Sequence, residues 1–243
     1  MLRRTVRMLM SVIVMTGAMV GVSATSGTAH AAGCYTWNRT LSEGSSGADV
    51  TQLQIRVAGW VTSGERLSYD GVYGARTAAA VKKFQSAYGL PADGVAGSQT
   101  FSKIYALQDA DCTPVHFAYS ELNKCNSDWS GGAVSAATAK ANALKTMWKL
   151  EAMRHALGDV PITISSGFRS YACNSAVGGA STSRHLYGDA ADLTGSPSFC
   201  TLAKEARVHG FSEILGPGYP DHNDHAHVAL DPSPYWSAPN CGI

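Results

Sequence analysis

The stretch DGVYGARTAAAVKKFQSAYGLPADGVAGSQT, residues 70–100, contains one short pattern twice. Asp70-Gly71 and Asp93-Gly94 each begin a tight turn, because an Asp side chain can bond nearby backbone and Gly tolerates a left-handed backbone. Thr77 and Thr100 follow the two turns at the same distance, where we expect helix N-caps. The repeat therefore predicts two matched turns, each leading into a helix.

Apolar residues at helical spacing surround this repeat. One predicted helix begins at Asp49 as its N-cap, and another begins near Thr77. Their apolar stripes are Val50, Leu53 and Val57 in the first helix, and Val81, Phe84 and Tyr88 in the second. With the helix after Thr100, they predict a small three-helix module, which we place at residues 32–112.

The remainder of the chain, residues 113–243, has a different pattern. We expect a long Ala-rich helix from Ser135 to Leu157 and a shorter one from Thr201 to Val208. Short apolar runs predict strands at residues 160–165, 189–194 and 225–230. Helices followed by short strands are typical of an α+β domain, here with a small, mainly antiparallel sheet.

The first 31 residues have the pattern of a secretory signal peptide. Arg3, Arg4 and Arg7 precede an apolar run, and Ala29-His30-Ala31 is a small-x-small cleavage signal. Its removal takes away three Arg and no acid, so the formal charge of +1 becomes about −2. We expect a secreted monomer that binds no nucleic acid and, after cleavage, no membrane.

Six cysteines follow the signal segment and none forms a C-x-x-C pair. An even number of Cys in an exported chain predicts disulfides rather than thiolate metal binding. The order along the chain favours nearest-neighbour pairing, which joins Cys34 to Cys112, Cys125 to Cys173, and Cys200 to Cys241.

Titratable side chains concentrate in two C-terminal segments. His185 precedes Asp192 by seven residues, and the segment Asp221–His227 contains three His and two Asp. So many adjacent titratable groups favour a metal ion that neutralises them, and imidazole with carboxylate ligands is typical of zinc. His185 and Asp192 are two candidate ligands. Alternation along the 225–230 strand places His225 and His227 on the same face, so either could be the third ligand.

If the zinc ion activates water for the hydrolysis of a peptide bond, the site also needs a general base and a cation for the substrate. Asp224, three residues before His227, is the candidate base for the attacking water. Arg169 follows the predicted 160–165 strand, and its guanidinium can hold a carboxylate or an oxyanion with two hydrogen bonds. A serine mechanism is not supported, because no Ser in the chain is followed three residues later by Lys.

The N-terminal module resembles the peptidoglycan-binding domain that accompanies many bacterial wall hydrolases. The resemblance covers about 70 residues and implies binding to wall polymer. Its matching elements are Gly44-Ser45-Ser46-Gly47, Val50, Leu53-Gln54, Asp70-Gly71-Val72-Tyr73-Gly74, Thr77, Ala80-Val81, Phe84-Gln85, Gly89-Leu90 and Asp93-Gly94-Val95-Ala96-Gly97.

The second domain resembles the zinc D-Ala-D-Ala carboxypeptidase and dipeptidase family. The resemblance rests on Ser183-x-His185-x-x-Gly188-x-Ala190-x-Asp192, on the acid three residues before His227, and on Gly167-Phe168-Arg169-Ser170. It implies one catalytic zinc ion and hydrolysis of the terminal D-Ala-D-Ala bond of wall stem peptides. An endopeptidase of the same fold and a non-catalytic zinc protein of the wall remain as alternatives.

The resemblance also assigns roles to single residues. His185, Asp192 and His227 become the zinc ligands, Asp224 the general base, and Arg169 the substrate-binding cation. His222 aligns with a His of the same site. Many relatives have Glu in place of Asp224, so the shorter side chain must approach the zinc-bound water more closely.

Overall fold

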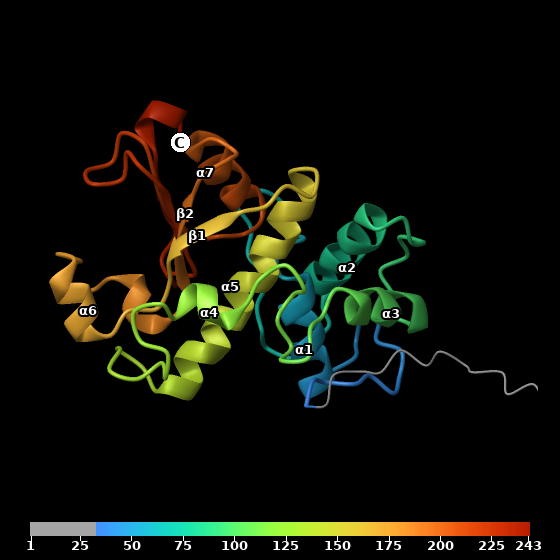
Figure 1. Cartoon of the computed structure of the whole chain (residues 1–243). Coiled ribbons are helices and arrows are strands. Elements are labelled where there is room, and N and C mark those ends of the chain that lie inside the picture. Colours follow the sequence, from blue (N-terminus) through green and yellow to red (C-terminus); the bar gives the residue numbers. More distant parts are fainter. Residues whose placement is uncertain (1–32) are drawn as a thin grey trace, which may run out of the picture.

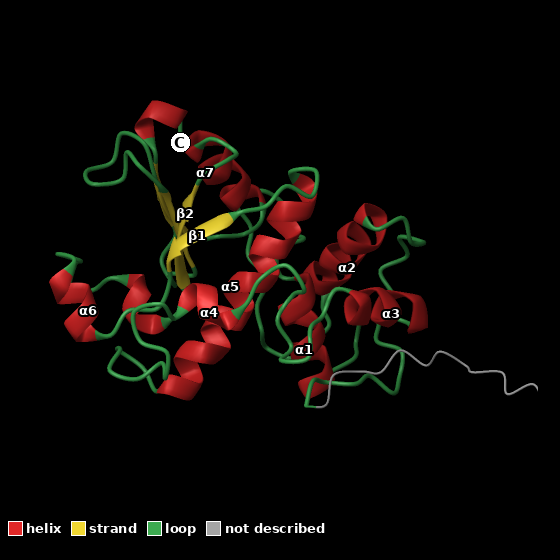
Figure 2. Cartoon of the chain, in the orientation of Figure 1, coloured by secondary structure: helices red, strands yellow, loops and turns green. Residues whose placement is uncertain are grey.

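The computed structural model describes residues 33–243, and the expected signal peptide lies outside these residues. Helices α1–α3 form one group, and the sheet with α4, α6 and α7 forms another (Figures 1 and 2). The long helix α5, Ala136–Ala156, runs between them. Among the described residues, no helix is long and apolar enough to cross a membrane.

The N-terminal module contains the three expected helices. They are α1 Ala48–Val57, α2 Ala75–Ala87 and α3 Ser98–Ala106. Each follows a Gly at its N-cap, namely Gly47, Gly74 and Gly97, and none has a side-chain cap. The prediction that Asp49, Thr77 and Thr100 cap these helices is therefore wrong, since all three lie inside the first turn.

Instead of capping a helix, the Thr hydroxyl in each half of the repeat accepts a hydrogen bond from a buried Gln. The Nε2 group of Gln54 donates to Asp70, to the Val72 carbonyl and to the Thr77 hydroxyl, while its Oε1 accepts from the Gly71 N–H. Gln85 makes the same four bonds with Asp93, Val95, Thr100 and Gly94. The sequence repeat is thus a repeat of one hydrogen-bond network, in which the Thr is an acceptor for a side chain.

The second domain contains a five-stranded sheet with the order β1-β2-β4-β3-β5. Three neighbouring pairs are antiparallel and only β3 with β5 is parallel, which confirms a small, mainly antiparallel sheet in an α+β fold. The strands are β1 Thr163–Ser166, β2 Ala190–Thr194, β3 Glu213–Leu215, β4 Ala226–Ala229 and β5 Tyr235–Ser237.

Short helices surround this sheet. They are α4 Tyr119–Leu122, α6 Tyr171–Ala176 and α7 Phe199–Val208, with 3-10 helices at Arg184–Tyr187 and Pro239–Cys241. The strand expected from residue 160 begins only at Thr163, because Pro161 has no N–H to give to a neighbouring strand. The three-residue strands β3 and β5 were not predicted.

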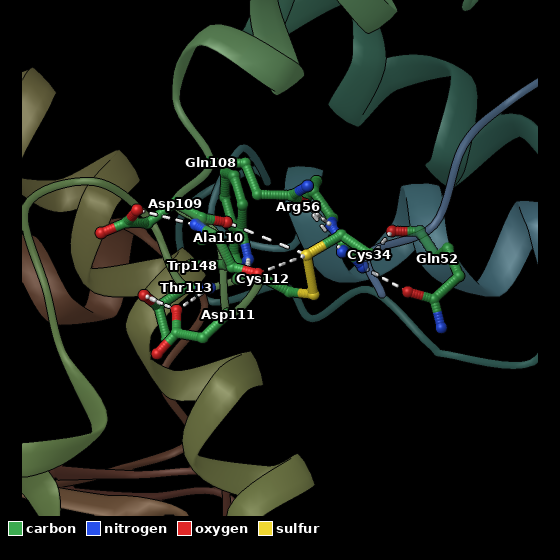
Figure 3. The surroundings of a disulfide bond; sticks show 10 residues. All are labelled: Cys34, Gln52, Arg56, Gln108, Asp109, Ala110, Asp111, Cys112, Thr113 and Trp148. Carbon is green, nitrogen blue, oxygen red and sulfur yellow. Dashed lines mark hydrogen bonds between the residues drawn. A yellow bond between two sulfur atoms is a disulfide. The ribbon is translucent and has the colours of Figure 1, made fainter. Parts of the chain in front are cut away.

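Three disulfides join Cys34 to Cys112, Cys125 to Cys173, and Cys200 to Cys241, which is the nearest-neighbour pairing. Figure 3 shows the first bridge with Arg56 and Trp148 beside it. Trp148 of α5 donates from Nε1 to the Cys112 carbonyl at 3.2 Å. The bridge therefore closes the N-terminal module at the point where it contacts α5.

Helix α5 contributes to both hydrophobic cores. Met147 and Leu150 pack in the core of the second domain, whereas Trp148 and Ala152 pack in the core of the N-terminal module. Between them, Lys149 is buried and donates to the carbonyls of Ala58 and Gly210, one from each side of the interface. The two domains therefore share one helix, while the boundary near residue 112 stays a prediction.

Candidate metal centre

Three potential metal ligands converge at one end of the sheet. Nδ1 of His227 lies 2.9 Å from Oδ1 of Asp192, and Nε2 of His185 lies 3.1 Å from both of these atoms. All three side chains are buried. In the described part of the chain, these are the His, Cys, Asp or Glu side chains whose potential ligand atoms lie close enough together to hold one ion.

Strand pairing brings two of these residues together. Asp192 on β2 and His227 on β4 are direct partners in the antiparallel register. Side chains opposite one another in such a pair have Cβ atoms only about 5 Å apart on the same face. The register of two short strands therefore places a carboxylate beside an imidazole without help from any loop.

A single 3-10 turn supplies the third residue. His185 lies in Arg184–Tyr187, which begins after the Ser183 cap and ends at Gly188 in the left-handed region with φ of 75°. A Cβ on Gly188 would stand 2.5 Å from the Ala139 carbonyl oxygen, so α5 leaves room only for Gly. The backbone N–H of Arg169 donates to the His185 carbonyl and fixes the other side of the turn.

Each of the three side chains has a further partner outside the cluster. Nδ1 of His185 donates to the Gly167 carbonyl. Nε2 of His227 donates to Oε1 of Glu213 at 2.9 Å. Oδ2 of Asp192 accepts from Nη2 of Arg169 at 2.7 Å. Sequence reasoning missed Glu213, because a lone acid on an unpredicted three-residue strand carries no motif.

Burial and mutual contact shift the pKa values of all three side chains. Burial alone raises the pKa of Asp192, but the His185 and His227 side chains outweigh burial and hold that pKa below its usual value. Burial lowers the pKa of His185, so this imidazole favours its neutral, ligating form. Against burial, the hydrogen bonds to Asp192 and Glu213 raise the pKa of His227 to about 9. A cation would therefore compete with a proton at His227.

The donor set fits a zinc ion. Two imidazole nitrogens and one carboxylate oxygen are the ligands of many catalytic zinc sites, which keep a fourth position open. Ligand atoms about 2.1 Å from zinc in tetrahedral geometry are roughly 3.4 Å apart. The separations of 2.9–3.1 Å between the three atoms are close to that value, so a small outward movement opens the site.

The other candidates from the His-rich segment lie around this cluster. Nε2 of His225 is 3.6 Å from Oδ1 of Asp192, and its Nδ1 donates to Asp224 at 2.8 Å. The Asp224 side chain is 89% exposed. The His222 ring lies 5.9 Å from the His227 ring and bonds the Pro220 carbonyl through Nδ1. Thus His227 is within the cluster, whereas His222, Asp224 and His225 flank it.

Arg169 lies between the cluster and a neighbouring pocket. Besides Asp192, its guanidinium contacts the Ser166 hydroxyl at 3.0 Å through Nε. The pocket of about 350 Å³ is lined by Arg169 with Phe168, Val177 and the Cys125–Cys173 bridge. Arg169 therefore contacts a candidate ligand on one side and a partly apolar space on the other.

Two family models match the chain. Residues 115–229 match the family described as Peptidase M15, and residues 46–104 match a peptidoglycan binding domain. The first match contains the whole cluster of His185, Asp192 and His227. The second contains the duplicated Gln network.

Individual proteins are similar to the whole chain or to its first part. The zinc D-Ala-D-Ala carboxypeptidase of Streptomyces albus G is 63% identical, with 99% of each chain covered. The spore cortex-lytic enzyme of Bacillus cereus is 42% identical over 26% of this chain and 24% of its own length. A crystal structure of the SleB N-terminal domain is 38% identical, with 28% of this chain and 92% of that chain covered and a TM-score of 0.26.

Proposed function

The chain belongs to the M15 family of peptidases, and we propose on this basis that it is a zinc carboxypeptidase that hydrolyses the terminal D-Ala-D-Ala bond of peptidoglycan stem peptides. Similarity to the carboxypeptidase of Streptomyces albus G extends over both domains. The single observation that carries the proposal is the convergence of His185, Asp192 and His227 on one point within the matched domain.

We assign the zinc ion to these three side chains. When bound there, zinc supplies a Lewis acid that polarises the scissile carbonyl and acidifies water. His185 favours its neutral form, whereas His227 would have to give up a proton to the solvent when zinc binds, and Asp192 supplies the negative charge. The remaining steps depend on residues of the chain that lie around the three ligands.

Asp224 is the proposed general base. Its carboxylate is exposed beside the cluster and is held by Nδ1 of His225 at 2.8 Å. A carboxylate in that position can take a proton from water and return it to the leaving D-Ala amine. His222 lies in the same loop as Asp224, and its proposed role is to contact the substrate or the charge that develops during the reaction.

Arg169 is the proposed substrate-binding residue. Nη2 already donates to Asp192 and Nε to Ser166, which leaves Nη1 for another acceptor. The terminal carboxylate of the substrate is such an acceptor, and the partly apolar pocket beside Arg169 has room for the methyl group of D-Ala. This arrangement favours cleavage next to a free C-terminus.

We further propose that the protein acts outside the cell as a monomer attached to the wall. The support is the match of residues 46–104 to a peptidoglycan binding domain, together with three disulfides typical of exported proteins. Its partners are then wall polymer through the first domain and stem peptides through the second.

Product analysis on a defined stem peptide ending in D-Ala-D-Ala tests the function. The purified protein with one equivalent of zinc should release D-Ala, and chelation should abolish release until zinc is restored. Zinc-loaded protein that leaves the terminal bond intact but cuts inside the peptide would show the endopeptidase alternative. Zinc-loaded protein that cleaves neither the terminal bond nor a bond inside the peptide would indicate the non-catalytic alternative.

A further inference from the structure

Glu213 lies against the cluster from a strand that no sequence pattern identified. It is the first residue of β3, which pairs antiparallel with β4. Its Oε1 is 2.9 Å from Nε2 of His227, the ring nitrogen that faces away from Asp192 and His185. The strand adjacent to His227 thus supplies a carboxylate to the far side of the imidazole.

This location is costly for a carboxylate. The Glu213 side chain is only 22% exposed, and its chain neighbours Ser212 and Ile214 are fully buried. Removing a charged group from water is unfavourable unless a partner compensates it. Among the described residues, the hydrogen bond recorded for Glu213 goes to His227. A purely structural role would be served better by an apolar residue on this strand.

In the neutral form of His227 that can bind a metal, the hydrogen bond to Glu213 determines which nitrogen carries the lone pair. A neutral imidazole carries its proton on one nitrogen and a lone pair on the other. An acceptor beside Nε2 keeps the proton there, so that the lone pair of Nδ1 points toward Asp192 and His185. We propose that Glu213 is a positioning residue that fixes the tautomer and orientation of His227 for metal binding, an inference that rests on the ligand set of the proposed function.

The other two proposed ligands are held differently. His185 is held by the Gly167 carbonyl, which belongs to the backbone and survives any side-chain substitution. Asp192 is held by Arg169, which the proposed function also uses for substrate. Glu213 therefore offers a place where the support of a ligand can be removed without touching a ligand or a substrate-binding residue.

Metal affinity of the purified protein tests this role directly. We would measure the zinc Kd of the wild type, Glu213→Gln and Glu213→Ala by competition with a chelator, and record the visible spectrum of the cobalt-substituted forms. Loss of an outer partner of a metal-bound His typically weakens binding about 10- to 100-fold. Glu213→Ala should fall in this range with an altered cobalt spectrum. Glu213→Gln should lie between it and wild type, because the amide oxygen still accepts.

Glu205→Gln is the matched control. This acid also stands beside a histidine, with Oε2 3.6 Å from Nε2 of His209, but it lies on α7 away from the cluster. Its zinc Kd should equal that of the wild type. Zinc Kd values within twofold of wild type for both Glu213 variants would overturn the role, and the Gln variant alone decides if the Ala variant does not fold.

Failure of the proposed function gives a different result. If His227→Ala keeps one tightly bound zinc, the ligand set is wrong regardless of Glu213. If D-Ala is not released while zinc binds normally, the reaction is wrong, yet the ratio of zinc Kd values between Glu213→Gln and wild type still reports on positioning.

Discussion

Nη2 of Arg169 lies 2.7 Å from Oδ2 of Asp192, while Oδ1 of the same carboxylate faces His185 and His227. One oxygen is thus bonded to a cation and the other is directed into the cluster. This geometry orients the carboxylate for monodentate binding of an ion. Arg169, the proposed substrate-binding residue, therefore also contacts a proposed metal ligand.

Arg169→Lys should lower kcat/KM for a D-Ala-D-Ala peptide by about 10- to 100-fold, because a hydrogen bond to a charged group typically contributes about 1.5–3 kcal/mol. A lysine cannot hold Asp192, Ser166 and a substrate carboxylate at once, because it lacks the planar fork. Steady-state kinetics of the variant, together with its zinc content, test this prediction. Arg76→Lys, an exposed Arg at the start of α2, should show wild-type kinetics.

Asp224→Asn should reduce turnover by about 10²- to 10⁴-fold, the range for loss of a general base. Zinc content should not change, since Asp224 lies outside the three-residue cluster. Asp224→Glu should retain much of the activity because the acid is preserved. Asp221→Asn, an exposed residue of the same loop, serves as control. Full activity of Asp224→Asn would exclude this residue as the base.

His227→Gln and His225→Gln should differ in zinc stoichiometry. The His227 ring is buried with Nδ1 2.9 Å from Asp192, whereas Nε2 of His225 is 3.6 Å away. Elemental analysis after dialysis should show loss of zinc for His227→Gln and about one zinc per chain for His225→Gln. The reverse pattern would make His225 the ligand.

Lys149→Met should remove a pH dependence of stability. Burial, reinforced by Arg66, lowers the pKa of Lys149 to about 7 from an ordinary value of 10.5. Between these values the unfolded chain holds a proton that the folded chain has released, so the free energy of unfolding rises with pH in this window. Urea unfolding at several pH values should show this rise in wild type.

The slope should be smaller in Lys149→Met and unchanged in Lys204→Met, whose side chain is exposed on α7. Equal slopes in all three proteins would mean that Lys149 keeps its ordinary pKa at the interface.

Gln85→Ala should lower the free energy of unfolding by about 2–4 kcal/mol, since it removes the partner of the buried Thr100 hydroxyl and of the buried Gly94 N–H. Gln54→Ala should cost a similar amount, because it makes the same four bonds in the other half of the repeat. Gln99→Ala, with an exposed side chain, is the control. A loss below about 0.5 kcal/mol for both buried residues would contradict the network's importance.

The sequence predicted the elements with strong periodicity. The stripe of Val81 and Phe84 correctly indicated α2, and the α+β class followed from the order of helices and strands. The helix caps were wrong because Gln54 and Gln85 reach the Thr hydroxyls from other segments. Local patterns do not contain such contacts.

The site was predictable in composition but not in arrangement. The density of His and Asp indicated a metal, yet alternation placed His225 and His227 on the same face. Strand β4 begins only at Ala226, so His225 lies before it and His227 pairs with Asp192. Glu213 joined the site through β3, whose three residues are too few to show any period.

Helix α5 has a consequence for the engineering of chimeras. Trp148 and Ala152 complete the core of the N-terminal module, while Met147 and Leu150 complete the other. Exchange of the module for one from another hydrolase, cut at residue 112, would leave a foreign surface against these side chains. A transplantable module must therefore include a surface complementary to α5. Chimeras in which Trp148, Lys149 and Ala152 are repacked against the new module should be more stable to unfolding than chimeras joined only in the linker.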